Sequence, residues 1–145
     1  MRVIKMLLAS LALFGLVLSA TAQDTKAYKE GAVTQLSYIK IKPGKFDTYM
    51  KYLSGDYKKL MEAYVKAGLV TRYGVYAARA KTPHEADIIL TVTSPNFAAL
   101  DKVDEREAIS AKLMGSSDAR SKGTIDRGAM RDVLGSELIQ ELILK

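Results

Sequence analysis

The segment YIKIKPGKF, residues 38–46, has the pattern of a β-strand that ends in a tight turn and leads into a helix. Polar and apolar residues alternate over 39–42, which is typical of a strand with one buried face. Pro43 ends the strand because it has no backbone N–H to donate, and Gly44 permits the turn. The sequence therefore predicts a strand over 33–42 that is followed directly by a helix.

The helix after this turn has one apolar face. Its apolar and aromatic residues recur at steps of three and four, and Ser54-Gly55 interrupts the pattern without shifting its phase. We therefore predict a kink at this pair within one continuous helix. Gly68 fits a left-handed cap at the end of the helix, with Leu69 packing back on the last turn. The apolar face consists of Phe46, Tyr49, Met50, Leu53, Tyr57, Leu60, Met61 and Tyr64.

Two further strands are expected over 69–79 and 87–93, where β-branched and aromatic residues gather. The Ile88-Ile89-Leu90 run indicates that the second of them is buried on both faces. A polar connection that contains Pro83 joins the two strands.

A helical pattern begins at the Ser-Pro pair 94–95 and continues to residue 114, with a break near 100–103. Residues 118–134 have weaker helical character because two glycines interrupt them. The apolar run over 137–144 predicts a last strand.

The order of these elements is β-α-β-β-α-β with an extra helix before the last strand. This order predicts an α+β, ferredoxin-like fold, a four-stranded antiparallel sheet with helices on one face. The third and last strands are apolar on both faces, and an apolar sheet face that nothing covers must meet a partner. We therefore expect a homodimer in which a second copy covers the sheet face away from the helices.

The N-terminus has the pattern of a signal peptide over 1–22. Two basic residues precede an uncharged apolar run over 6–18, and a small-x-small motif at 20–22 predicts cleavage between Ala22 and Gln23. A retained membrane anchor is the alternative, but the apolar run is shorter than the roughly 20 residues that span a bilayer. The chain has no cysteine, which excludes a lipoprotein anchor and disulfides. We expect an exported protein, periplasmic or secreted.

The rest of the chain is long enough for one domain. We predict a flexible arm over 23–32 and a single domain over 33–145. The 22 basic and 16 acidic residues give a net charge of +6, and two of the basic residues lie in the leader. Because basic and acidic residues alternate instead of forming a stripe, no nucleic-acid partner is expected. No membrane contact is expected after cleavage.

The strand-turn-helix segment over 38–46 resembles the opening of the dimeric α/β-barrel superfamily. In that group a strand ends in a lysine-valine-lysine-proline-glycine type turn, and an aromatic residue follows in the first helical turn. The segments EADIIL (85–90) and SPNF (94–97) are similar to small bacterial members. The resemblance implies that two chains pair through their sheets and close an eight-stranded barrel, with a cavity in each half. Members include cofactor-free monooxygenases, haem-dependent enzymes and stress proteins, so the resemblance implies no single chemistry.

The chain carries none of the standard catalytic or nucleotide-binding motifs. Without cysteine there is no thiolate nucleophile, and a single histidine cannot build a zinc site from several imidazoles. The acidic run over 101–107 lacks the spacing and the glycine of a calcium loop. We therefore predict no cofactor and no metal site.

His84 precedes the third strand in the segment TPHEAD (82–87). It could be a general base held by Asp87, or an axial ligand to haem iron. The alternative is a partly exposed loop histidine beside a proline. Haem-binding relatives generally take their ligand from a helix, which counts against haem here.

Seven of the eight tyrosines lie between residues 38 and 76. Tyr38, Tyr73 and Tyr76 fall on predicted strands, and the last two must point to opposite faces because they are three positions apart. One of these two should face the cavity, where a phenol could hydrogen-bond a small aromatic or quinone-like ligand. The alternative is a tyrosine that only fills the sheet interface.

Arg72 and Arg79 also fall on opposite faces of the second strand. An arginine in the cavity would pair with an anionic ligand or with an acid, and Asp87 on the next strand is the candidate. The alternative is an ordinary ion pair at the rim of the sheet. The complete set of pocket candidates is Tyr38, Arg72, Tyr73, Tyr76, Arg79, His84 and Asp87.

Three functions remain open from the sequence. The first is an exported homodimer that binds a small molecule in the barrel cavity or acts as a scaffold, which the missing catalytic motifs favour. The second is a cofactor-independent monooxygenase or isomerase that uses the cavity to hold an activated substrate. The third is haem binding.

Overall fold

The structure, a computed structural model, describes residues 26–145. The predicted leader over 1–22 lies outside the described residues. The elements are β1 (Tyr28–Ile41), α1 (Phe46–Tyr52), the π-helical turn η1 (Leu53–Tyr57), α2 (Lys58–Lys66), β2 (Arg72–Ala77), β3 (Ile88–Ser94), the 3-10 turn η2 (Phe97–Ala99), α3 (Val103–Met114), α4 (Ser117–Gly128) and β4 (Arg131–Leu144). No helix among these residues is long and apolar enough to cross a membrane.

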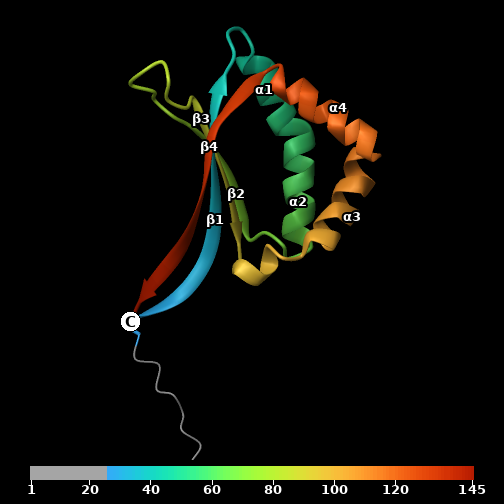
Figure 1. Ribbon diagram of the computed structural model, residues 1–145. Coiled ribbons are helices and arrows are strands. Elements are labelled where there is room, and N and C mark those ends of the chain that lie inside the picture. The colour runs from blue at the N-terminus through green and yellow to red at the C-terminus, as the bar shows by residue number, and fades with distance from the viewer. Residues whose placement is uncertain (1–25) are drawn as a thin grey trace, which may run out of the picture.

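The four strands form one antiparallel sheet in the order β2-β3-β1-β4. All helices lie on one side of the sheet, and the other side is open (Figure 1). This arrangement confirms the α+β fold with a four-stranded antiparallel sheet. The helix α3 packs on α2, and α4 contacts β4.

The long pairing between β1 and β4 corrects two predicted boundaries. The strand β1 starts at Tyr28, so the arm predicted over 23–32 is wrong for residues 28–32. The strand β4 starts at Arg131, so residues 131–134 are not the helix that was predicted there. In both cases the backbone hydrogen bonds come from a distant partner, because 28–30 pair with 142–144 and 37–41 pair with 131–136.

Both glycine turns predicted around the first helix are present. Gly44 has φ +71°, and Lys45 N donates to Lys42 O at 3.0 Å to close the turn after β1. Gly68 has φ +72°, and Leu69 N donates to Tyr64 O at 3.0 Å, which caps the end of α2. Glycine suits these two positions because it adopts positive φ without a steric penalty.

The irregularity predicted at Ser54-Gly55 is the π-helical turn η1. Residues 49, 53, 57 and 61 are all buried and follow one another in steps of four. In a regular α-helix, steps of four drift around the axis by about 40° each, because a residue advances about 100°. A π turn takes up an extra residue. The turn therefore keeps the buried residues on the side of the helix that faces the sheet.

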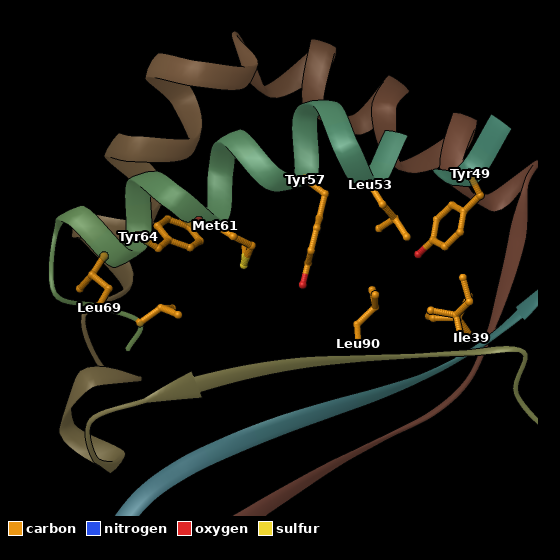
Figure 2. Packing of buried hydrophobic residues seen from close by; sticks show 10 residues of the cluster. Ile39, Tyr49, Leu53, Tyr57, Met61, Tyr64, Leu69 and Leu90 are labelled. Carbon is orange, nitrogen blue, oxygen red and sulfur yellow. The ribbon is translucent and has the colours of Figure 1, made fainter. Parts of the chain in front are cut away.

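The core lies between this helical segment and the sheet. Tyr49 and Tyr57 point from the helices toward the strands, where Ile39 and Leu90 lie, and Tyr64 lies beside Met61 and Leu69 (Figure 2). The Tyr64 hydroxyl donates to Arg106 O at 3.3 Å and shares a hydrogen bond of 3.0 Å with Ser110 Oγ. The hydroxyls of Tyr49 and Tyr57 are buried and have no partner within residues 26–145.

Arg106 fixes α3 to the rest of the domain. Its Nη2 donates to Leu69 O, Ser94 Oγ and Ala99 O at 3.1, 3.2 and 3.3 Å. Its guanidinium lies over the ring of Tyr64, 5.3 Å from the ring centroid. A single half-buried side chain thus joins α3 to α2, to β3 and to the turn after β3.

The three buried tyrosines should respond differently to loss of the hydroxyl. Tyr64→Phe should lower the free energy of unfolding by about 1 kcal/mol, because it removes hydrogen bonds to α3. Tyr49→Phe and Tyr57→Phe should leave stability unchanged or raise it, because each removes a buried donor without a partner. Urea unfolding of the three variants tests this. A loss of more than about 1 kcal/mol at Tyr49 or Tyr57 would show that its hydroxyl has a partner in solution.

Candidate functional site

The sheet face away from the helices, here called the outer face, carries three of the predicted pocket residues. Tyr76, Ile89, Tyr38 and Gly135 form one row across the four strands. Tyr38 donates to Glu137 Oε2 at 2.9 Å, and this hydrogen bond raises the pKa of the Tyr38 phenol. Arg72 lies on the same face two rows away. The structure therefore brings Tyr38, Arg72 and Tyr76 to one surface.

The outer face is a mixed surface and not an apolar one. Its next row contains Gly74, Thr91, Leu36 and Glu137, and the row after that contains Arg72, Thr93, Thr34 and Ile139. Thr34 and Thr93 share a hydrogen bond of 2.9 Å between their hydroxyls.

Tyr73 lies on the helix side of the sheet, opposite Tyr76. Its partner across the sheet is Val92, and its ring packs edge-on against Tyr57 at 6.1 Å between centroids. The prediction that Tyr73 and Tyr76 point to opposite faces is thus confirmed. Tyr73 packs at the edge of the core.

Asp87 is paired with Lys40 and not with an arginine. Its Oδ1 accepts from Lys40 Nζ at 2.9 Å, and its Oδ2 accepts from Ile41 N at 2.9 Å. These two hydrogen bonds hold the pKa of the Asp87 carboxyl below its usual value. The expected pairing of Asp87 with Arg72 or Arg79 is absent from the described residues.

His84 and Arg79 lie in the exposed connection between β2 and β3. Within residues 26–145 no hydrogen bond joins His84 to Asp87, whose two oxygens are taken by Lys40 and Ile41. The structure therefore does not assemble the general-base pair considered for His84.

Asp87 makes the free energy of unfolding depend on pH in the acidic range. Because its pKa is lower in the folded chain, the ionised form stabilises the fold at neutral pH, and this contribution is lost as pH falls through the folded-state pKa. Between about pH 6 and pH 3 the wild type should lose stability more steeply than Asp87→Asn. Urea unfolding across this range measures the difference. Asp132→Asn is the control, because Asp132 is an exposed partner of Lys42, and equal slopes for wild type and Asp87→Asn would contradict the assignment.

A cleft of about 460 Å³ opens between the segment α1–η1–α2 and the helices α3 and α4. None of the predicted pocket residues lines it. A smaller recess of about 260 Å³ adjoins it, and Arg127 and Arg131 line both hollows. The cleft is lined by Tyr52, Asp56, Leu60, Ser110, Met114, Ala119, Arg120, Gly123, Thr124, Asp126, Arg127, Met130 and Arg131.

Two arginines and two tyrosines form a stack at one end of this cleft. The rings of Tyr49 and Tyr52 are stacked, with centroids 5.8 Å apart. Arg127 lies over the Tyr52 ring at 5.6 Å, and Arg131 lies over the Tyr49 ring at 5.5 Å. Each guanidinium is thus held by a cation–π contact, which stabilises its position without using its N–H groups.

The charges that line the cleft are not all neutralised. Arg120 forms an ion pair with Glu107, and Asp126 forms one with Lys122 at 2.8 Å. Within the part of the chain that the structure describes, Arg127 and Arg131 have no carboxylate partner. Arg127 donates to Thr124 Oγ1 at 2.8 Å, while the buried Nε of Arg131 has no acceptor.

Burial raises the pKa of Tyr49 and of Tyr57 to about 12. The positive charge of Arg131 partly offsets this rise at both residues. Both phenols therefore remain protonated well above neutral pH, and each keeps an O–H that can donate a hydrogen bond. No group of three His, Cys, Asp or Glu side chains that could hold a metal occurs among the described residues.

Comparison with known proteins gives a likeness of structure only. No protein-family model and no curated protein matches this chain. HapK from Hahella chejuensis superposes with a TM-score of 0.51 over 75% of this chain and 91% of its own, at 13% identity. The chain has the ferredoxin-like fold. At this identity the likeness shows nothing beyond the fold.

A candidate chlorite dismutase, TA0507, superposes with a TM-score of 0.41 at 14% identity, over 76% of this chain. The matched region is 43% of that protein's length. This similarity is too weak to carry an argument about function.

Sequence reasoning missed the cleft because its walls come from separate segments. Tyr52 lies on the side of the first helix away from the apolar stripe, and Arg127 and Arg131 lie four residues apart around Gly128. The two arginines were a signal in the sequence, but the predicted helix over 118–134 placed both in one helix. The structure places Arg127 in α4 and Arg131 in β4.

Proposed function

We propose that this protein is an exported homodimer that binds a small molecule in the cleft between its helices. The observation that carries the proposal is the cleft, which combines a few apolar side chains with polar ones and has the arginines Arg127 and Arg131 at one end. Ligand pockets have volumes of roughly 300–1,000 Å³ and combine an apolar lining with a few polar groups. The π turn η1 supports the assignment, since such turns are frequent at functional sites.

The proposed ligand site differs from the one expected from the sequence. That expectation put the ligand between two sheets, whereas the cleft lies on the helix side of each subunit. Binding is favoured over turnover because a general base works best with a pKa near the working pH. The two phenols with a raised pKa, those of Tyr49 and Tyr57, do not line the cleft, so neither supplies such a base there.

Self-association through the outer face and export are further parts of the proposal. The outer face is open (Figure 1), and Ile139 on its edge strand is 47% exposed. The sequence resemblance to the dimeric α/β-barrel superfamily supports pairing through this face. The leader pattern over 1–22 supports export.

Ile139→Lys should convert the dimer into a monomer, because it would place a charge in the proposed interface. Leu138→Lys is a matched control. Leu138 is the neighbouring residue on the same strand, is 48% exposed and points to the helix side. Sedimentation velocity of the exported chain measures both. A stable wild-type monomer at micromolar concentration, or equal effects of the two variants, would contradict the outer-face dimer.

Gly123→Phe should abolish small-molecule binding by filling the cleft. A side chain fits at this position, since an added Cβ would meet only the end of Arg127, at 3.4 Å from Nη1. Fluorine NMR with a library of neutral and anionic aromatic fragments should find binders to the wild type that the variant loses. Ser121→Phe, at an exposed position of the same helix, should keep them. If no fragment distinguishes the wild type from Gly123→Phe, the proposed binding function is wrong.

A further inference from the structure

The arginine end of the cleft has donors that no group in the described chain uses. The Arg131 side chain lies over Tyr49, and its Nε is buried without an acceptor. Arg127 makes one side-chain hydrogen bond, to Thr124. A buried donor without a partner carries a desolvation penalty, and a guanidinium carries a full charge as well. An anion in the cleft would offset the charge penalty of the two guanidinium groups.

We propose that the ligand of this cleft is a small organic acid, with one carboxylate held by Arg127 and Arg131 and an apolar body on the cleft wall. This inference rests on the proposed function and adds the chemical class of the ligand. A carboxylate suits these side chains because its two oxygens match the paired N–H groups of a guanidinium. The cation–π contacts with Tyr52 and Tyr49 already hold both guanidinium groups in place, which lowers the entropy cost of binding.

The rest of the lining fits an apolar body. Leu60 on α2, Met114 at the end of α3 and Met130 before β4 give the wall three apolar side chains from separate elements. Methionine side chains adapt to the shape of a bound group. The hydroxyls of Ser110 and Thr124 also line the cleft and can accept or donate a hydrogen bond.

The net charge of the cleft lining favours a ligand that carries a single negative charge. Three arginines and two aspartates line the cleft, so its net charge is +1. Asp56 belongs to the same wall and would repel a second negative charge on the ligand. A monocarboxylate therefore fits better than a phosphate ester with two charges.

The test compares two probes of nearly the same shape, naphthoate and the uncharged naphthamide, by isothermal titration calorimetry of the exported dimer. The wild type should bind naphthoate at least about tenfold more tightly than naphthamide, because hydrogen bonds to charged groups are the stronger ones. Arg127→Gln and Arg131→Gln should each weaken naphthoate by about tenfold and leave naphthamide unchanged. Arg79→Gln, in the exposed connection, should change neither.

The variant Arg131→Lys is a control that distinguishes a loss of binding from a folding defect. It keeps the charge but loses the paired N–H groups, so it should bind naphthoate with an affinity between the wild type and Arg131→Gln. Equal wild-type affinities for the two probes, or equal losses for both probes in the arginine variants, would overturn the inference. Neutral fragments lost by Gly123→Phe without any preference for the acid would refute only the ligand class. If no fragment and neither naphthalene probe binds in the cleft, the proposed function is refuted as well.

Discussion

The packing of one helical segment on the sheet determines the rest of this structure. The segment α1–η1–α2 presents Tyr49 and Tyr57 to the strands, and Tyr64 lies beside Met61 and Leu69 in the same core (Figure 2). The chain has no cysteine and no tryptophan, so these rings supply much of the large apolar area that a small core needs. Tyr49 and Tyr57, which are two steps of four residues apart, stay in line only because the π turn absorbs the drift of a regular helix. The arrangement leaves the hydroxyls of Tyr49 and Tyr57 without partners within residues 26–145.

The same repeat of four explains why a cleft exists on the other side of this segment. Tyr52, Asp56 and Leu60 also follow one another in steps of four, and all three line the cleft. Two arginines of the second helical pair, α3 and α4, contact tyrosines of this segment. Arg106 joins α3 to Tyr64 at one end, and Arg127 joins α4 to Tyr52 at the other. Between these two arginine–tyrosine contacts the helices do not close on each other, and the hollow remains.

Local signals in the sequence predicted most of the fold. Pro43-Gly44 and Gly68 mark the two turns correctly, since each acts through its own backbone preference. The start of β4 was not predictable in this way. Its first residues have a weak local pattern, and they form a strand because 37–41 pair with them. Alternation along a strand placed Tyr73 and Tyr76 on opposite faces. The cleft could not be predicted, because the segment α1–η1–α2, the helices α3 and α4 and one strand end must meet to form it.

The strand β4 connects the two surfaces to which we assign functions. Its first residue, Arg131, lines the cleft on the helix side, and Ile139 lies on the outer face. Every other element that lines the cleft is a helix or a turn on the helix side, and the outer face consists of strands alone. Within the described residues, β4 is therefore the one element that belongs to both surfaces. Coupling between binding and self-association needs an element that both sites bias. In this chain β4 meets that requirement, since Arg131 lines the cleft and Ile139 lies on the outer face.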